Sequence, residues 1–103
     1  MKKIVLTKRA VDLLETFFQY LESEWSVKTR DEFIEKFENA VFQIQKFPEI
    51  APKSKEIPNL HKYILTKQTS LFYRVDKTSI TIITVFDNRM NPKVLNYLTT
   101  KKL

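Results

Sequence analysis

The stretch that decides the fold runs from Ser79 to Pro92 and reads SITIITVFDNRMNP. Residues 80–86 are β-formers with apolar side chains at both odd and even positions, which is typical of a central strand covered on both faces. A polar segment follows at once, and it holds a single arginine, Arg89. At a strand end such an arginine is either half of an exposed ion pair, for example with Asp87, or an anchor for phosphate.

Two shorter β-rich segments precede this strand. His61–Thr66 and Leu71–Val75 are rich in apolar, β-branched and aromatic residues, as strands are. The turns between the three segments, residues 67–69 and 76–78, contain no glycine. Connections this short join neighbouring strands, so the last third of the chain predicts a three-stranded antiparallel meander.

The first half of the chain has a helical period instead. A short apolar strand, Lys3–Leu6, comes first, and Thr7 is then placed as the N-cap of an amphipathic helix. The apolar residues of this helix recur at spacings of three and four: Ala10, Val11, Leu13, Leu14, Phe17, Phe18, Leu21 and Trp25. We interpret Trp25, at the end of this helix, as an edge of the core rather than a binding platform.

A second helix is predicted after a brief break at residues 26–28. Thr29 and Glu32 match a capping box, and Pro48 ends the helix. Its core face is formed by Phe33, Phe37, Ala40, Val41 and Ile44. Because the turn between the two helices is so short, they are expected to form an antiparallel hairpin.

The predicted order of elements is therefore β-α-α-β-β-β, an α+β fold in one domain over residues 1–103. Asn91 and Pro92 are a good cap and first-turn pair for an additional short C-terminal helix. The helical hairpin is expected to cover one face of the sheet. The other face would belong to the basic second half of the chain and stay partly open for a partner.

The composition excludes several classes of site. The chain has no cysteine, no glycine and one histidine, His61. This rules out disulfides, thiolate catalysis, multi-histidine or cysteine metal sites, and the glycine-rich loops that bind nucleotides. We therefore expect no cofactor. No apolar run approaches the ~20 residues of a membrane span, so a cytoplasmic protein without membrane contact is expected.

The net charge of +6 is unevenly distributed. Residues 1–52 hold eight Lys or Arg against nine Asp or Glu, whereas residues 53–103 hold ten against three. The positive excess thus lies entirely in the second half. Such a bias favours a polyanionic partner, either a nucleic acid or an acidic protein segment, although a merely soluble basic surface would look the same.

With this order of elements, the chain resembles the RelE/ParE superfamily of bacterial toxins over nearly its whole length. The resemblance rests on the helix-ending Phe47-Pro48-Glu49, on the strand Leu71–Val75 and on the strand end Val85–Pro92. It implies the toxin half of a type II toxin–antitoxin pair, a growth inhibitor of the kind linked to plasmid stabilization. The implied partners are a cognate antitoxin, in a toxin–antitoxin hetero-oligomer, and a target.

The superfamily implies one of two targets. RelE-like members cut mRNA on the ribosome, whereas ParE-like members poison DNA gyrase without hydrolysis. Metal-independent RNA cleavage needs a base, a proton donor and cations for the phosphorane. The catalytic candidates, and equally the candidates for contacts to a target or a phosphate, are Lys62, Lys67, Arg74 and Arg89. His61 is a further candidate phosphate contact, and His61, Tyr63 and Tyr97 are possible proton donors.

Three departures from the ribonuclease pattern favour the ParE-like branch. Ser70 stands where ribonuclease members carry an arginine, and Asp87 stands where they often carry a histidine. Tyr97 lies too far along the chain to be the usual acid, and we interpret His61 as a surface residue rather than a general acid. The alternatives left open are a RelE-like endoribonuclease and a degenerate, non-toxic module that only binds the antitoxin.

Overall fold

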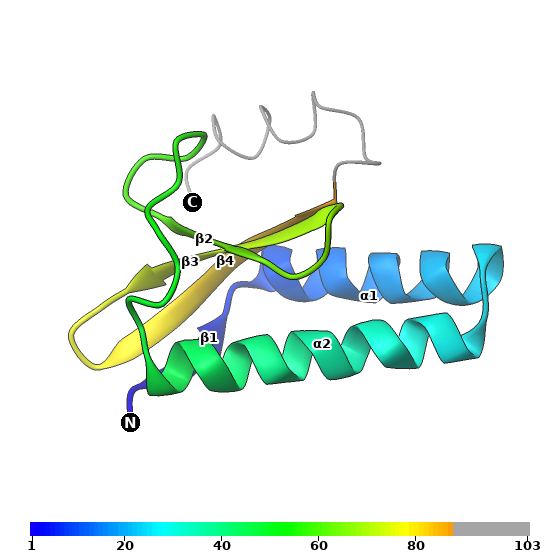
Figure 1. Cartoon of the computed structure of the whole chain (residues 1–103), viewed down its shortest axis with the longest axis horizontal. Helices are drawn as coiled ribbons and strands as arrows, with labels where there is room; N and C mark the ends of the chain where they lie inside the picture. Colours follow the sequence, from blue (N-terminus) through cyan, green and yellow to red (C-terminus); the bar gives the residue numbers. More distant parts are fainter. Residues whose placement is uncertain (88–103) are drawn as a thin grey trace.

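The helical hairpin lies along one face of a four-stranded sheet (Figure 1). In this computed structural model residues 1–87 are described, so the helix predicted from Asn91 lies outside the described residues, as do Arg89 and Tyr97. The helices are α1 (Lys8–Glu24) and α2 (Val27–Lys46). The strands are β1 (Lys3–Leu6), β2 (His61–Ile64), β3 (Thr69–Val75) and β4 (Ser79–Asp87). The predicted α+β fold is confirmed.

The sheet has the strand order β1-β4-β3-β2. Strands β2, β3 and β4 form the predicted antiparallel meander, and β1 pairs with β4 in parallel. Strand β4 therefore has a neighbour on each side, as its doubly apolar pattern indicates. The five residues from Ile80 to Thr84 are all buried, and Val85 follows them into the interior.

The start of α1 was predicted correctly, and the start of α2 was not. Thr7 Oγ1 accepts a hydrogen bond from the Ala10 amide at 3.0 Å and donates one to the Ile83 carbonyl at 2.9 Å. The cap of α2 is Ser26 rather than Thr29, because Ser26 Oγ accepts from the Thr29 amide at 3.0 Å. Residues 27 and 28 consequently belong to the first turn of the helix. The break between the two helices therefore consists of Trp25 and Ser26 alone.

The main core fills the space between the hairpin and the sheet. It consists of two adjoining clusters, whose buried members are Ala10, Ile44, Ala51, Leu71, Tyr73, Ile80 and Ile82 in one and Leu14, Phe17, Leu21, Phe33 and Val85 in the other. Phe37 and Val41 pack against these clusters from α2. The apolar spacing that predicted the two helices is thus the spacing that buries them.

A second, smaller core lies on the opposite face of the sheet. Ile57 and Leu60, from the loop between α2 and β2, are buried against Phe72 and Ile83. The loop turns back at Asn59, whose φ of 68° is in the left-handed region that asparagine tolerates. Apolar residues of the loop thus cover part of this face, which was expected to be partly open.

A β-bulge breaks the alternation of β4. Phe72 pairs with Thr84 while the next residue of β3, Tyr73, pairs with Ile82, so Ile83 is the additional residue. Ile83 packs under the loop, whereas Val85 packs against the helices. Ile83 and Val85 therefore lie on opposite faces of the sheet, although a regular strand would place both on one face, since the side-chain direction reverses at the bulge.

Tyr73 ties the end of α2 to the sheet and makes the fold sensitive to alkali. Its hydroxyl donates to the Pro48 carbonyl at 2.8 Å, and burial raises the pKa of this phenol above its usual value. The folded protein therefore holds the phenolic proton to higher pH than the unfolded chain, whose tyrosine pKa is about 10. This stabilisation is complete below about pH 10 and is lost as the pH rises through the pKa of the folded state.

Tyr73→Phe is expected to reduce the free energy of unfolding near pH 7 by about 1 kcal/mol, because one hydrogen bond is lost. The same variant should lose less stability than the wild type between about pH 9 and pH 11. Urea unfolding across this range measures both effects. The matched control is Tyr20→Phe, since Tyr20 is exposed. Parallel pH profiles for the wild type and Tyr73→Phe would contradict the expectation.

Candidate functional site

Two of the predicted cationic residues share the sheet face opposite the helices. Lys62 of β2 lies across from Phe72, and Arg74 follows two residues later on β3. Each is already paired with a carboxylate. Lys62 Nζ lies 2.9 Å from Glu56, which belongs to the covering loop, and Arg74 Nε lies 2.9 Å from Asp76 in the β3–β4 turn. Their charges are therefore partly compensated.

Asp76 organises the Arg74 end of this face. It accepts a hydrogen bond from Arg74 and a second one, at 3.2 Å, from the Thr81 hydroxyl. The hydrogen bond from Arg74 is the main reason that the pKa of Asp76 is lowered from its usual value. Asp76 is thus ionised at neutral pH and holds the guanidinium beside the strand. An incoming phosphate would have to compete with it.

Lys67 lies away from these two residues. It stands in the β2–β3 turn, two residues before β3, whereas Arg74 is near the opposite end of that strand. At about 3.3 Å per residue the two positions are roughly 20 Å apart along the strand. Among residues 1–87 the structure therefore does not gather Lys62, Lys67 and Arg74 into one compact cationic site.

His61 is part of the interior, which corrects its interpretation as a surface residue. It is 5% exposed, and its ring stacks on that of Tyr73 with centroids 5.0 Å apart. Nδ1 lies 2.7 Å from the Ala51 carbonyl, so this nitrogen carries the proton and donates it, while Nε2 is 3.6 Å from Glu49. Alternate residues of a strand point to the same face, so His61 shares a face with Tyr63 and Leu65, which pack on the core. This alternation could have predicted the burial of His61.

Tyr63, the other proton-donor candidate among residues 1–87, does not lie at this face either. Tyr63 is half-buried and packs against the core on the helix side of the sheet. Ser70, at the position where ribonuclease members carry arginine, pairs with Phe86 on β4. The described residues thus bring together Lys62 and Arg74 from the predicted set.

Asp87 is buried rather than presented to a ligand. It is 1% exposed at the end of β4 and accepts a hydrogen bond from Thr69 Oγ1 at 2.7 Å. Thr69 Oγ1 in turn accepts from Thr66 Oγ1 at 3.1 Å. This chain of bonds fastens the β2–β3 turn to the end of β4. The carboxylate therefore has a structural role at the end of β4.

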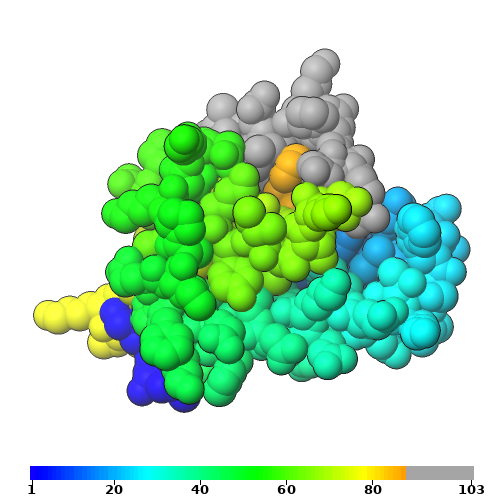
Figure 2. Space-filling model, in the orientation of Figure 1, coloured from blue at the N-terminus to red at the C-terminus, as the bar shows by residue number. Residues whose placement is uncertain are grey.

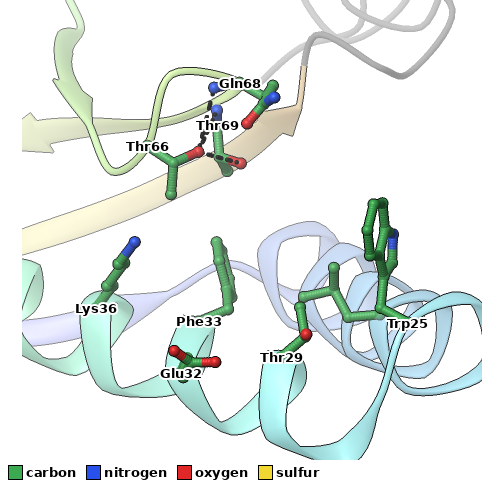
Figure 3. A pocket seen from close by; sticks show the side chains of 9 residues that line it. Trp25, Thr29, Glu32, Phe33, Lys36, Thr66, Gln68 and Thr69 are labelled. Atoms are coloured by element: carbon green, nitrogen blue, oxygen red, sulfur yellow. Dashed lines mark hydrogen bonds between the residues drawn. The ribbon is translucent and has the colours of Figure 1, made fainter.

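Sequence reasoning missed a pocket between the α1–α2 turn and the β2–β3 turn (Figure 3). Its cavity of about 370 Å³ is lined by Leu21, Trp25, Thr29, Glu32, Phe33, Lys36, Thr66, Gln68 and Thr69. Trp25 is 64% exposed, so its interpretation as a core edge is wrong. Its place one residue beyond α1, where the helix no longer packs on the sheet, is the signal that could have indicated exposure.

Within residues 1–87 there is no cluster of acidic, histidine or cysteine side chains that could hold a metal ion. None of the described helices is both long and apolar enough to cross a membrane.

Comparisons with known proteins place this architecture in one family. The sequence profile described as the ParE toxin of the type II toxin–antitoxin system parDE matches residues 4–92. No curated protein matches significantly by sequence. Among solved structures, the chromosomal ParDE toxin–antitoxin system from P. aeruginosa is similar, with a TM-score of 0.73 and 17% identity over 84% of this chain and 96% of that chain.

Two other toxins show the same fold at lower similarity. A mutant of E. coli RelE in the free state has a TM-score of 0.63 and 14% identity over 97% of this chain and 95% of that chain. The YoeB–YefM complex from Staphylococcus aureus has a TM-score of 0.57 and 12% identity over 84% of this chain and 95% of that chain. Since the family profile spans most of its sequence, this chain belongs to the ParE toxin family of type II toxin–antitoxin systems, within the RelE/ParE superfamily.

Proposed function

We propose that this toxin stops growth by binding DNA gyrase, and that a cognate antitoxin neutralises it. The ParE profile match and the higher TM-score with the ParDE system than with RelE support this branch. A gyrase target also implies a cytoplasmic protein. The toxin needs no cofactor for this action, because inhibition by binding requires a complementary surface and no bond cleavage.

The state of the basic side chains supports binding over RNA cleavage. Lys62 and Arg74 are engaged by Glu56 and Asp76, which leaves them less able to neutralise a phosphorane. A lysine acts as a base at neutral pH when nearby cations without counter-ions lower its pKa. Lys67 lies apart from both Lys62 and Arg74, so these residues do not form such a group. His61 is buried and its Nδ1 faces the Ala51 carbonyl, which supports a structural role over that of an acid for a leaving oxygen.

The antitoxin is proposed as the stable partner, in a hetero-oligomer. One of the similar structures is a complex of YoeB with YefM, so this fold occurs in such an assembly. The positive excess of residues 53–103 favours an acidic antitoxin segment on the second half of the chain. Lys53, Lys55, Lys67 and Lys77 are the described lysines of this half that form no ion pair within residues 1–87.

A supercoiling assay tests the proposed target. Purified wild-type toxin is expected to inhibit supercoiling of relaxed plasmid by purified gyrase. In a bacterial cell-free translation reaction, mapping of mRNA 5′ ends is expected to show no new cuts. The Arg89→Ala variant serves as the control for the second assay, because Arg89 is the candidate most closely tied to the RNA-cleaving branch.

Each alternative has its own signature. New cuts inside translated codons that disappear in Arg89→Ala would establish the ribonuclease and overturn our proposal. A protein that leaves both supercoiling and mRNA unchanged, but still binds its antitoxin tightly, would be the degenerate module.

A further inference from the structure

The pocket beside Trp25 has an apolar floor, and the part of the chain that the structure describes leaves the cavity above it unfilled. Leu21 and Phe33 form this floor and are almost fully buried. Phe33 is held edge-on by Phe17, with ring centroids 5.0 Å apart, and by Phe18, at 6.1 Å. An apolar cavity with a fixed floor is suited to receive a partner's side chain, because little ordering is needed on binding.

Trp25 forms one wall of this pocket and is held in place by the end of α1. Its backbone amide donates to the Leu21 carbonyl at 3.0 Å, and the Ser26 amide donates to the same carbonyl at 3.0 Å. The indole nevertheless remains largely exposed, which is unfavourable for so large an apolar surface. Exposed tryptophans beside buried apolar floors are typical anchors of protein interfaces.

Some polar side chains at the rim of the pocket form hydrogen bonds within the fold, and others do not. The hydroxyls of Thr66 and Thr69 are committed to each other and to Asp87. Within residues 1–87, by contrast, the side chains of Glu32, Lys36 and Gln68 make no hydrogen bond or ion pair. Glu32 and Lys36 stand one helical turn apart, so the rim offers one negative and one positive charge at a fixed spacing.

We propose that this pocket seats an anchoring side chain of the toxin's target protein. The segment of the target that fits this pocket carries an aromatic or large aliphatic residue, whose side chain enters the space between Trp25 and Phe33. On one side of this residue the target segment carries a basic side chain that pairs with Glu32. On the other side it carries an acidic side chain that pairs with Lys36. The inference rests on the proposed function, a toxin that acts by binding a protein.

Charge assigns this pocket to the target rather than to the antitoxin. An acidic antitoxin segment is complementary to the basic second half, whereas six of the nine lining residues come from residues 21–36 of the nearly neutral first half. The mixed pair of Glu32 and Lys36 would repel a uniformly acidic segment at one of its two positions. A segment of mixed charge with an apolar centre suffers no such repulsion.

Alanine variants of two exposed aromatic residues give the first test. Trp25→Ala is expected to raise the toxin concentration for half-inhibition of gyrase supercoiling at least about 30-fold, the scale of an interface hot spot. The matched control is Phe42→Ala, because Phe42 is 53% exposed and lies toward the other end of α2. It should stay within about 3-fold of the wild type.

A charge reversal and a single fluorine signal give the second test. Trp25 is the one tryptophan of the sequence, so 5-fluorotryptophan labelling yields a resonance that reports on this pocket alone. Adding gyrase should change its chemical shift in the wild type and much less in Lys36→Glu, whereas line broadening only reports that a large complex has formed. The control is Lys77→Glu. Figure 2 shows its turn, β3–β4 (yellow), projecting at the opposite end of the molecule from the α1–α2 turn.

The outcomes separate this inference from the proposed function. If the wild type inhibits gyrase, but Trp25→Ala inhibits equally well and the fluorine chemical shift does not change, the target binds elsewhere and the inference alone fails. If the wild type neither inhibits nor binds gyrase, the proposed target is wrong and the inference falls with it. Thermal unfolding of each variant shows that a loss of inhibition does not come from misfolding.

Discussion

Phe72→Ala is expected to destabilise the protein by about 3–5 kcal/mol, the usual cost of emptying a buried aromatic site. Phe72 is 1% exposed and is the centre of the small core in which Ile57, Leu60 and Ile83 hold the loop on the sheet. Domains of this size are stable by only about 5–15 kcal/mol, so the variant should unfold at a much lower urea concentration.

The control for this prediction is again Phe42→Ala, which removes an equal volume from an exposed position. It should change the free energy of unfolding by no more than about 0.5 kcal/mol. If Phe72→Ala were equally mild, the loop would not be packed on the sheet. That result would contradict the packing of Ile57 and Leu60 against Phe72.

His61→Ala is expected to cost about 2–4 kcal/mol, which makes it the second large effect. The change removes a buried ring stacked on Tyr73 and leaves a cavity. It also leaves the Ala51 carbonyl without the donor that lies 2.7 Å away, an additional penalty for a buried acceptor. Urea unfolding at pH 7 measures the sum of these effects.

Lys62→Ala is the matched control, because the neighbouring Lys62 points to the other face and pairs with Glu56 at the surface. Its effect should be below about 1 kcal/mol. A stable His61→Ala protein that has specifically lost activity would contradict the structural role and restore His61 as a candidate phosphate contact or proton donor.

Much of the fold follows from patterns that tertiary contacts reinforce. The doubly apolar run at residues 80–86 predicted a central strand, and β4 lies between β1 and β3 with cores on both faces. The apolar spacing of the two helices included all of their buried residues, although it also included Val11 and Trp25, which are exposed. Thr7 was also correctly predicted, because a threonine before such a spacing has few other roles.

The sequence did not predict local structure correctly where two conformations were both compatible with it. Ser26 and Thr29 are both good caps, and Thr29 has the capping box, yet Ser26 starts the helix. The bulge at Ile83 has no glycine to mark it, because it arises from the pairing of β4 with β3. The loop reads as polar and proline-rich, and Ile57 with Leu60 was the weak sign that it packs on the sheet.

The candidate site was predicted less well than the fold, for a physical reason. The residue types at Lys62 and Arg74 indicate cations, but their availability depends on Glu56 and Asp76, which approach from a loop and a turn. Burial of His61 depends likewise on Ala51, ten residues earlier in the chain. Properties that arise from partners distant in sequence or from loop conformation are not encoded in a local pattern.

The parallel pairing of β1 with β4 has a consequence for synthesis on the ribosome. The first strand of the sheet has its partner in the last one, and the Lys2 side chain donates to the Asp76 carbonyl across 74 positions of sequence. Contacts of such range form late, because the long loop must close first. The protein therefore cannot complete its described sheet until translation has passed residue 87, and until that moment β1 of an emerging chain lacks its partner strand.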